Sequence, residues 1–442
     1  MRSKVLLFNL PPLGGDLFPV SLGYIAASLA RRNIDSMICE IDADSSLSPD
    51  DIREFILDYQ PTVVGLAIYQ INVRLAVKLA RLVKSCDPAI VVAVGGPQAT
   101  FMPKDALAQM PCVDVIVRGE GETVLPDLVT CVARRRNAVR RHDVCRRGGV
   151  TRQHTLARVR GIAFRDAAGI HETAPPMLVR NLDRFPSPYQ TGVFRWSDHS
   201  GAAMLTSRGC TYACGFCYTP RAFGRTIRTH SVRRVLADMS ACVRHGKRRF
   251  FFADPSFTFD KKRVQSIMRG IIKRRWKIEI WCETRTDLVD APLLALMAAA
   301  GVKRIAYGLE SVDPVVNKAL HKPIEPRHFA ATIRMTQRAG IEAEIFTLYG
   351  LPQQTRESAL HTLRFVQSLG VEIAHNSSGQ QLHLFFGTNV LAHPREYGIR
   401  MQHKRRPAYV SPGTDFETEW MSKKDIAFVA RKYRAAHFPS NK

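Results

Sequence analysis

Short apolar runs alternate with amphipathic segments over the first ~130 residues of the chain. We expect strands at residues 5–9, 37–41, 63–68, 91–94 and 113–117. Residues 21–31 gather apolar side chains on one helical face, and further helices are expected over residues 73–84 and 122–134. This alternation predicts an α/β fold with a doubly wound parallel sheet of the Rossmann or flavodoxin-like kind. Such sheets bind ligands at the carboxyl ends of their strands.

A second strand–helix series begins near Gly201. Its expected strands are residues 202–206, 249–253, 278–283, 304–309, 342–348 and, as the sixth, 382–386. Helices are expected at residues 232–244, 262–274, 291–300 and 357–369. Six such units predict an open, partial (β/α)6 barrel, whose reactive groups lie at the carboxyl ends of the strands.

Between the two series, residues 159–189 predict a small β-hairpin followed by a linker rich in proline and turn residues. The expected organisation is therefore a Rossmann-like domain over residues 1–133, an Arg-rich insert and linker over 134–200, the barrel over 201–395, and a helical tail over 396–442.

Composition adds limits to this picture. An apolar share of 45% and a charged share of 23% are typical of globular proteins. The apolar run at the N-terminus stops at Pro11 and Pro12, too early for a signal peptide, and the apolar stretch at 291–302 suits a buried helix better than a bilayer span. We therefore expect a cytoplasmic protein with no membrane span.

The net charge of +25 invites the question of a nucleic-acid partner. Residues 134–160 alone hold ten arginines against one acid, Asp143, and show no helical or strand period. We interpret this segment as a flexible insert, which argues against nucleic acid as a partner. A basic loop that holds an anionic substrate or RNA is the alternative left open.

The strongest chemical signal is Cys210-Thr-Tyr-Ala-Cys214-Gly-Phe-Cys217. Three thiolates at this spacing can hold three irons of a 4Fe–4S cluster and leave the fourth iron without a protein ligand, whereas a cluster for electron transfer alone normally has four cysteines. A zinc site is the main alternative. It needs four closed ligands, and Cys242, Cys282 and His199 do not stand at zinc-finger spacing from the triplet.

This cysteine string, with an aromatic residue just before the last cysteine, resembles the signature of the radical S-adenosylmethionine (SAM) enzymes. In that family SAM binds the open iron, and its reductive cleavage gives a 5′-deoxyadenosyl radical that removes hydrogen from unactivated carbon. The resemblance therefore implies a 4Fe–4S cluster held by Cys210, Cys214 and Cys217. It implies SAM as a second cofactor, bound to the open iron. It also implies a reducing partner such as flavodoxin or ferredoxin.

Residues at the ends of the expected barrel strands are candidates to contact SAM: Phe216, Tyr218, Asp254, Arg285, Glu310 and Ser311. Asp254, in a segment that resembles the family's, could instead cap the next helix. Arg285 could pair with the SAM carboxylate or form a structural ion pair with Glu283. The string Gly308-Leu-Glu310-Ser311 resembles the family's Gly-x-Glu-Ser segment.

Glycine-rich loops after the N-terminal strands, in the order Pro-Pro-Leu-Gly, Val-Gly-Gly-Pro and Arg-Gly-Glu-Gly-Glu, resemble the cobalamin-binding domain fused to many radical SAM enzymes. The resemblance covers residues 4–130 and implies a cobalamin site at Leu13, Gly14, Tyr69, Gln70, Gly95, Gly96, Gly119 and Glu120. The Asp-x-His-x-x-Gly motif that supplies a cobalt ligand elsewhere is absent, and no histidine precedes His142. A vestigial domain that binds no corrinoid is the alternative.

Together these resemblances imply a cobalamin-dependent radical SAM methyltransferase of secondary metabolism, acting on an unactivated carbon or a phosphorus atom of a small-molecule substrate. An oxidative cyclase or rearrangement enzyme would use the same parts without methyl transfer. An RNA or protein methylthiotransferase would need a second N-terminal cysteine cluster, and residues 1–130 hold only Cys39, Cys86 and Cys112. A corrinoid- or SAM-sensing binding protein is the non-enzymatic alternative.

Overall fold

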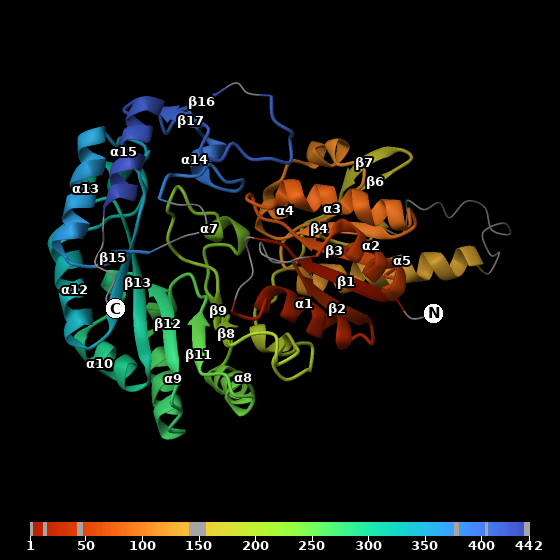
Figure 1. The fold of residues 1–442 in the computed structure, drawn as a ribbon, viewed down its shortest axis with the longest axis horizontal. Helices are drawn as coiled ribbons and strands as arrows, with labels where there is room; N and C mark the ends of the chain where they lie inside the picture. The colour runs from red at the N-terminus through yellow and green to blue at the C-terminus, as the bar shows by residue number, and fades with distance from the viewer. Residues whose placement is uncertain are drawn as a thin grey trace. The chain divides into compact units, whose positions relative to one another are not determined.

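The computed structural model describes residues 3–11, 16–41, 47–140, 156–374, 380–402 and 405–436. The chain divides into two compact units (Figure 1). Unit 1 comprises Met1–His199 with Arg405–Ser411, and unit 2 comprises Ser200–Lys404 with Pro412–Lys442. Among the described residues, no helix combines the length and the apolar character needed to cross a membrane.

Unit 1 is built on a sheet of strand order β2-β1-β3-β4-β5-β6-β7. Its parallel strands are β1 (Lys4–Asn9), β2 (Asp35–Glu40), β3 (Val63–Ala67), β4 (Val91–Gly95) and β5 (Val115–Val117). The central strands are apolar on both faces because helices cover both; Val5, Leu6, Leu7 and Phe8 are all buried. The predicted doubly wound sheet is confirmed.

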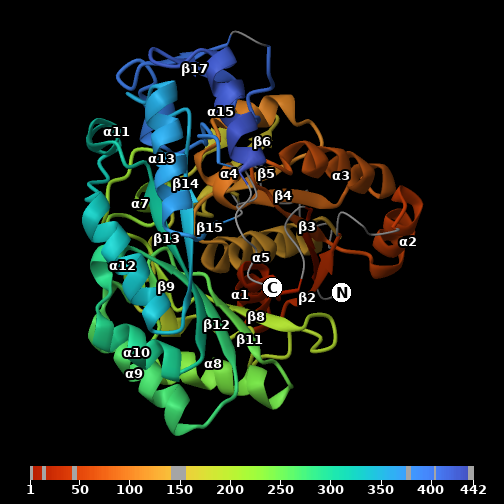
Figure 2. The same ribbon diagram turned by 60° about the vertical axis from the view of Figure 1, so that its left-hand side comes forward.

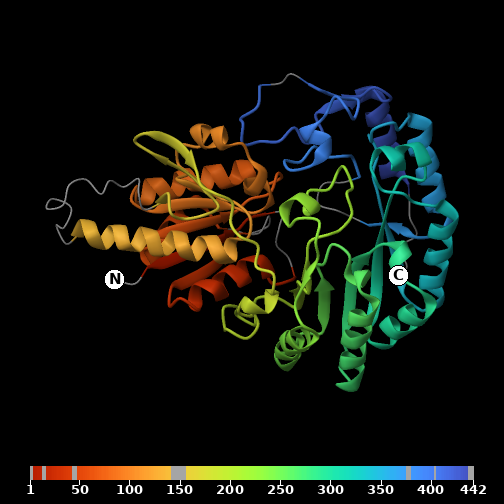
Figure 3. The same cartoon turned by 180° about the vertical axis from the view of Figure 1, so that it is seen from behind.

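The helices of unit 1 lie on the two faces of this sheet (Figure 3). They are α1 (Val20–Ala30), α2 (Pro49–Tyr59), α3 (Val73–Cys86), α4 (Pro97–Phe101) and α5 (Gly121–Arg140), with a 3-10 turn η1 over Lys104–Gln109. Packing pairs α1 with α5 and α2 with α3. The sequence analysis missed α2, a charge-rich helix that begins at Ser48 with a capping box closed by Asp51.

The hairpin β6 (Ile162–Asp166) and β7 (Gly169–Glu172) extends this sheet, since β6 pairs antiparallel with β5. The sequence analysis predicted this hairpin but assigned it to the segment between the domains, whereas Ile162, Ala163 and Phe164 are buried in the core of unit 1. Residues 405–411 also belong to unit 1: Gln98 Nε2 donates to the Tyr409 carbonyl at 2.9 Å. The predicted helical tail is therefore only partly right. Its helix is α15 (Lys423–Ala435), preceded by strands β16 (Ile399–Met401) and β17 (Phe416–Thr418).

Unit 2 holds a parallel sheet of order β15-β14-β13-β12-β11-β8 (Figure 2). The strands are β8 (Gly201–Met204), β11 (Arg249–Phe252), β12 (Glu279–Thr284), β13 (Val302–Glu310), β14 (Glu342–Thr347) and β15 (Glu372–Ile373). The predicted sixth strand, residues 382–386, is wrong because β15 takes that place. Leu382 and Leu384 pack instead in a separate apolar cluster with Leu320 and Phe416.

Helices follow the strands of unit 2 and cover the outer face of the sheet: α8 (Val232–Arg244), α9 (Lys261–Lys273), α10 (Ala291–Ala299), α12 (Pro326–Arg338) and α13 (Arg356–Ser368). Shorter helices are α7 (Thr219–Ala222), α11 (Pro314–Ala319) and α14 (Asn389–Ala392). The Tyr307 hydroxyl lies 2.8 Å from Thr336 Oγ1 of α12, so Tyr307 faces the helices. Its neighbours Ala306 and Gly308 therefore face the opposite, inner side.

Candidate cluster and cofactor sites

The three cysteines lie in one closed loop of unit 2. The loop runs from β9 (Ser207–Arg208) to β10 (Arg228–Thr229), and these two short strands pair antiparallel at its neck. Gly209, with a φ of +95°, enters the loop; a Cβ there would lie 2.1 Å from the Thr226 carbonyl oxygen. The loop directly follows β8, so it stands at the carboxyl end of the first barrel strand, as predicted.

Asp254, two residues after the end of β11, binds the neck of this loop. Its carboxylate, 1% exposed, accepts hydrogen bonds from the backbone N–H of Thr206 at 2.8 Å and of Ser207 at 2.6 Å, and from the Thr206 hydroxyl at 2.5 Å. Burial raises the pKa of Asp254, while these hydrogen bonds act in the opposite direction. Asp254 is therefore a positioning residue for the cysteine loop; its direct contact with SAM stays a prediction.

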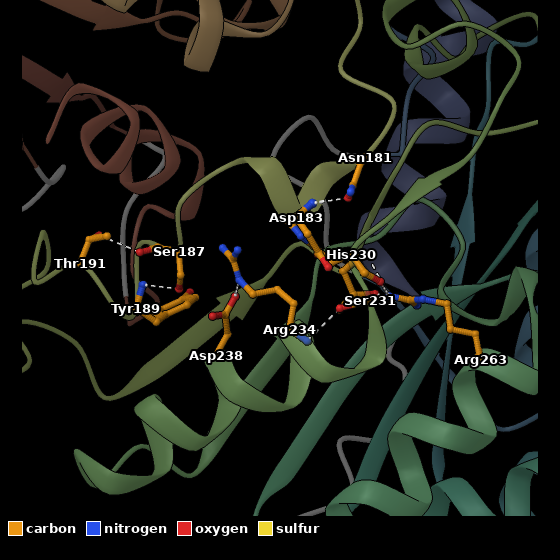
Figure 4. A network of polar contacts seen from close by, with 11 residues as sticks. Asn181, Asp183, Ser187, Tyr189, Thr191, His230, Ser231, Arg234, Asp238 and Arg263 are labelled. Atoms are coloured by element: carbon orange, nitrogen blue, oxygen red, sulfur yellow. Dashed lines mark hydrogen bonds and ion pairs between the residues drawn. The ribbon is translucent and has the colours of Figure 1, made fainter. Parts of the chain in front are cut away.

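Arg263 of α9 joins the two sides of the same neck. Its Nη2 donates to the Thr206 carbonyl at 2.9 Å. It also donates to the His230 carbonyl at 3.1 Å (Figure 4). Ser231 then caps α8 by accepting from the Arg234 N–H at 3.1 Å, and Arg234 pairs with Asp238 at 2.8 Å. Buried polar groups thus hold the base of the cysteine loop on both sides.

The tip of the loop is held by backbone contacts. The Gly215 N–H donates to the Leu320 carbonyl at 2.9 Å, and the Gly215 carbonyl accepts from the Val390 N–H at 3.1 Å. A Cβ at Gly215 would lie 2.9 Å from the Tyr397 hydroxyl, so only glycine fits without displacing that tyrosine. Phe216 packs against the apolar cluster that contains Leu320. Its predicted contact with SAM is untested.

The donor set suits a cluster held by three thiolates. Cys210, Cys214 and Cys217 are partly exposed, whereas Cys242 and Cys282, the other cysteines of unit 2, are fully buried. Burial raises the pKa of Cys214 to about 11 and raises that of Cys210, while Lys322 and Arg285 act in the opposite direction. Bound iron would favour the thiolate form of both cysteines against this effect of burial. The residues present therefore fit a 4Fe–4S cluster with one open iron.

A buried ion pair lies beside the loop. Lys322 Nζ donates to Glu310 Oε1 at 2.7 Å, and each side chain is only 7% exposed. The same Nζ lies 5.7 Å from the Phe216 ring centroid, and a Cβ at Gly308 would come within 2.5 Å of it. The sequence pointed to Glu310 but missed Lys322, because nothing local marks a lone lysine after α11 as buried.

Two other predicted SAM residues have partners within the protein. Arg285 donates to both carboxylate oxygens of Asp287, at 2.9 and 3.1 Å, and its guanidinium lies 3.9 Å from the Tyr212 ring centroid. Of the two alternatives left open for Arg285, the ion pair with Glu283 does not form, since Asp287 takes that place. The hydroxyl of Ser311, fully buried, accepts from the Asp313 N–H at 3.1 Å. Tyr218, partly exposed, stands at the N-cap of α7.

The inner face of the barrel carries acidic groups that the sequence analysis did not assign to a site. Glu283, Ala306, Glu344 and Glu372 form one row across four strands. Arg304 donates to Glu344 at 2.9 Å. Within the described residues, Glu283 makes no hydrogen bond or ion pair; burial, with a smaller effect of the Glu344 charge, raises its pKa to about 7. Trp281, on the same face, stacks on Phe251 with ring centroids 4.2 Å apart.

In unit 1 the predicted cobalamin residues follow the carboxyl ends of β3, β4 and β5, while Leu13 and Gly14 lie outside the described residues. Gln70 Oε1 is buried and has no hydrogen-bond partner among the described residues. Its neighbour Tyr69 is partly exposed, and burial raises the pKa of that phenol. An unpaired buried acceptor at this edge fits a ligand that donates a hydrogen bond, such as a corrin amide.

The backbone of this edge is shaped by glycine. Gly96 has a φ of +105°, and a Cβ there would lie 2.8 Å from the Ile68 carbonyl oxygen. Gly119 has a φ of +72°, and Gly95 ends β4. Glu120 is 5% exposed. Asn72 has a structural role beside this edge: it is 1% exposed and accepts a hydrogen bond from the Tyr69 N–H at 2.7 Å.

Sequence comparisons agree with this division of the chain. Residues 9–129 match the B12 binding domain, and residues 204–366 match the radical SAM superfamily. The predicted pairing of these two domains is confirmed. The cofactors expected from the sequence, a 4Fe–4S cluster, SAM and cobalamin, are those that these two domain families imply.

Several individual proteins are similar to this chain over most of its length. An uncharacterized methyltransferase of Pyrococcus horikoshii is 26% identical over 85% of this chain and 80% of its own. The anaerobic magnesium-protoporphyrin IX monomethyl ester cyclase of Rubrivivax gelatinosus is 26% identical over 82% of this chain, which spans 64% of that enzyme. The radical SAM methyltransferase TsrM of Kitasatospora setae, solved with cobalamin and a [4Fe–4S] cluster, has the same fold, with a TM-score of 0.76, 16% identity, and coverage of 100% of this chain and 90% of its own.

Proposed function

We propose that this chain, which combines a B12-binding domain with a radical SAM domain, is a cobalamin-dependent radical SAM methyltransferase. Its substrate is a small molecule that accepts the methyl group on an unactivated carbon or on phosphorus. The observation that carries this proposal is the closed three-cysteine loop at the carboxyl end of β8, in the same chain as a glycine-lined sheet edge with an unpaired buried acceptor. The similarity to the Pyrococcus horikoshii methyltransferase over 85% of this chain supports it.

When bound, the cluster supplies the electron that cleaves SAM, and cobalamin supplies a carrier for the methyl group. The residues of the chain hold and orient. Asp254 and Arg263 fix the neck of the cysteine loop, so that Cys210, Cys214 and Cys217 keep one geometry. Lys322 holds Glu310 beside that loop, where its carboxylate can accept hydrogen bonds from SAM hydroxyl or ammonium groups.

The substrate, in this proposal, faces the inner wall of the barrel. Glu283 is an acceptor without a partner among the described residues, and the stacked pair Phe251 and Trp281 offers a flat apolar surface beside it. These groups suit a substrate with an aromatic or planar part and a hydrogen-bond donor. A Glu283→Gln variant should therefore raise the substrate KM, while uncoupled SAM cleavage stays near the wild-type rate. An unchanged KM would remove Glu283 from the substrate site.

A second candidate function is an oxidative cyclase or rearrangement enzyme, favoured by the similarity to the magnesium-protoporphyrin cyclase. It needs the same cysteine loop but no methyl transfer. The products of SAM distinguish the two functions, as described below.

Two further parts of the proposal concern the surroundings of the protein. An external one-electron donor of the flavodoxin or ferredoxin class would reduce the cluster, since the chain contains only one cysteine triplet of this kind. A reducing, cytoplasmic compartment would keep the nine described cysteines, all of them free, in the thiol state.

The test is anaerobic turnover of the reconstituted protein with methyl-labelled SAM, a reductant and cell extract as a source of substrate. Methyl transfer predicts two products of SAM, 5′-deoxyadenosine and S-adenosylhomocysteine, and label in a small molecule. Deoxyadenosine alone would indicate the cyclase class. If neither product forms, while SAM or a corrinoid binds, the protein is a sensor and the proposed function fails.

A further inference from the structure

Two neighbouring loops at the amino ends of β11 and β12 concentrate positive charge on one surface of unit 2. We name them the basic loop pair, residues 244–249 and 269–277; their sequences are Arg-His-Gly-Lys-Arg-Arg and Arg-Gly-Ile-Ile-Lys-Arg-Arg-Trp-Lys. They contain no Asp or Glu. Their exposed cations are Arg244, Arg248, Arg249, Arg269, Lys273, Arg274, Arg275 and Lys277.

The two loops form one continuous surface because they are joined by a backbone hydrogen bond and by packing of the helices that precede them. The Glu279 N–H donates to the Arg248 carbonyl at 2.8 Å, and Arg249 is in register with Glu279 in the parallel pair of β11 and β12. The helices that lead into the loops, α8 and α9, pack closely: a Cβ at Gly270 would come within 2.4 Å of Leu236 Cδ1.

Five of the eight exposed cations have no acidic partner among the described residues. Within the described residues, Arg244, Arg269, Lys273, Arg275 and Lys277 form no ion pair with an acid. Others turn toward backbone oxygens: Arg248 donates to the Val243 carbonyl at 2.8 Å and Arg274 to the Gly270 carbonyl at 2.9 Å. Like charges this close together repel one another, and a bound polyanion would offset that repulsion.

Apolar side chains are set among these cations. Ile272 is 39% exposed, and Trp276 is partly exposed between Arg275 and Lys277. The guanidinium of Arg274 lies 5.5 Å from the Trp276 ring centroid. A tryptophan and an aliphatic side chain flanked by Lys and Arg have the composition of surfaces that lie at a membrane–water interface.

The basic loop pair is remote from the cysteine loop along the barrel. It stands at the amino ends of the strands, whereas the cysteine loop follows the carboxyl end of β8. A strand of six residues such as β12 spans about 20 Å. This distance argues against the substrate and against the electron donor as the occupant of the basic surface.

We propose that the basic loop pair docks the protein on an anionic lipid surface, with Trp276 and Ile272 entering the headgroup region. RNA is the competing polyanion. The two loop segments contain no Asn, Gln, Ser, Thr or Tyr, the side chains that with Arg and Lys make most contacts to sugars, phosphates and bases. Because the guanidinium of Arg274 already lies near the Trp276 ring, contacts of Lys and Arg with lipid phosphates account for this surface better than stacking of bases on that ring.

The experiment uses the full chain with its cluster reconstituted, and vesicles of phosphatidylcholine either pure or with about a quarter phosphatidylglycerol. The variant Arg275→Glu/Lys277→Glu reverses two exposed charges of the basic loop pair. The matched control, Arg334→Glu/Arg338→Glu, makes the same reversal on exposed positions of α12. Cosedimentation measures binding, and equal cluster absorbance and melting temperature show that each variant is folded.

We expect the wild type and the α12 control to bind the anionic vesicles equally, and the loop variant to bind at least about tenfold more weakly. Binding to pure phosphatidylcholine should be near background, and added salt should weaken binding to the anionic vesicles. Trp276 emission should shift to the blue on the vesicles, a change lost in Trp276→Phe. Equal binding of the loop variant and the wild type would overturn the proposal. Loop-dependent binding to transfer RNA with no binding to vesicles would overturn it in favour of RNA. These measurements involve no turnover, so their outcome is independent of the proposed methyltransferase activity.

Discussion

The cysteine loop of unit 2 and the glycine-lined edge of unit 1 are built on opposite principles. The cysteine loop is held by buried charged groups: Asp254 and Arg263 at its neck, and Lys322 with Glu310 beside it. The edge of unit 1 is shaped by backbone, with Gly96 and Gly119 in left-handed conformations and Gln70 left unpaired. Changes in the first region should therefore lower the unfolding free energy, whereas changes in the second should spare the fold and impair ligand binding.

The largest expected effect follows from Asp254→Ala. This change leaves the N–H groups of Thr206 and Ser207 without their acceptor. It also leaves the buried guanidinium of Arg263 without the negative charge of Asp254. Together these losses should lower the unfolding free energy by about 3–5 kcal/mol. Asp260→Ala, six residues along, removes only a helix cap at Arg263 N–H and should cost about 1 kcal/mol. Chemical denaturation of the metal-free protein measures both. Equal costs would mean that the neck is not held by Asp254.

An intermediate effect is expected for Lys322→Met. Glu310 would then be buried without its cation, which should cost about 3 kcal/mol, whereas the exposed Lys318→Met should cost less than about 0.5 kcal/mol. Because Lys322 also lies near the cysteine loop, losing its charge should make the reduction potential of a reconstituted cluster more negative. Potentiometry checks this shift. A potential equal to that of the wild type would limit Lys322 to a structural role.

The smallest effect on stability is expected for a change in unit 1. Gln70→Asn shortens a side chain whose carbonyl oxygen has no hydrogen-bond partner in the described protein, so the unfolding free energy should change by less than about 1 kcal/mol. The corrinoid retained on purification should nevertheless fall several-fold. Gln60→Asn, before the amino end of β3, is the matched control and should retain wild-type corrinoid. If Gln70→Asn lost stability but kept its corrinoid, Gln70 would be a structural residue and not part of the ligand site.

Much of the fold could be read from the sequence because its signals are local and periodic. Helix α8 has the predicted bounds, Val232–Arg244. The misses have physical causes. Strand β15 is only two residues long, too short to leave an alternation, while the apolar run at 382–386 is buried for another reason. The charged helix α2 is marked by its cap and hardly by apolar positions.

The site was harder to predict beyond its cysteines. A motif identifies Cys210, Cys214 and Cys217, but the partners of a side chain depend on which way it turns in the folded chain. Arg285 has an acid two residues away on either side; the 3-10 turn η5 (Thr286–Leu288) brings Asp287 to it, while Glu283 makes no ion pair with it. Lys322 is buried only because the barrel brings Glu310 and Phe216 to it from distant segments.

The central claim is that one chain holds both an open cluster and a corrinoid. The most direct test is to isolate the protein anaerobically from a cobalamin-supplied host, reconstitute the cluster, and quantify iron, sulfide and extracted corrinoid per chain. The account predicts one 4Fe–4S cluster that is lost in Cys214→Ala, together with stoichiometric corrinoid. A cluster with no corrinoid, even after incubation with excess cobalamin, would contradict it and leave unit 1 as a domain that has lost its ligand.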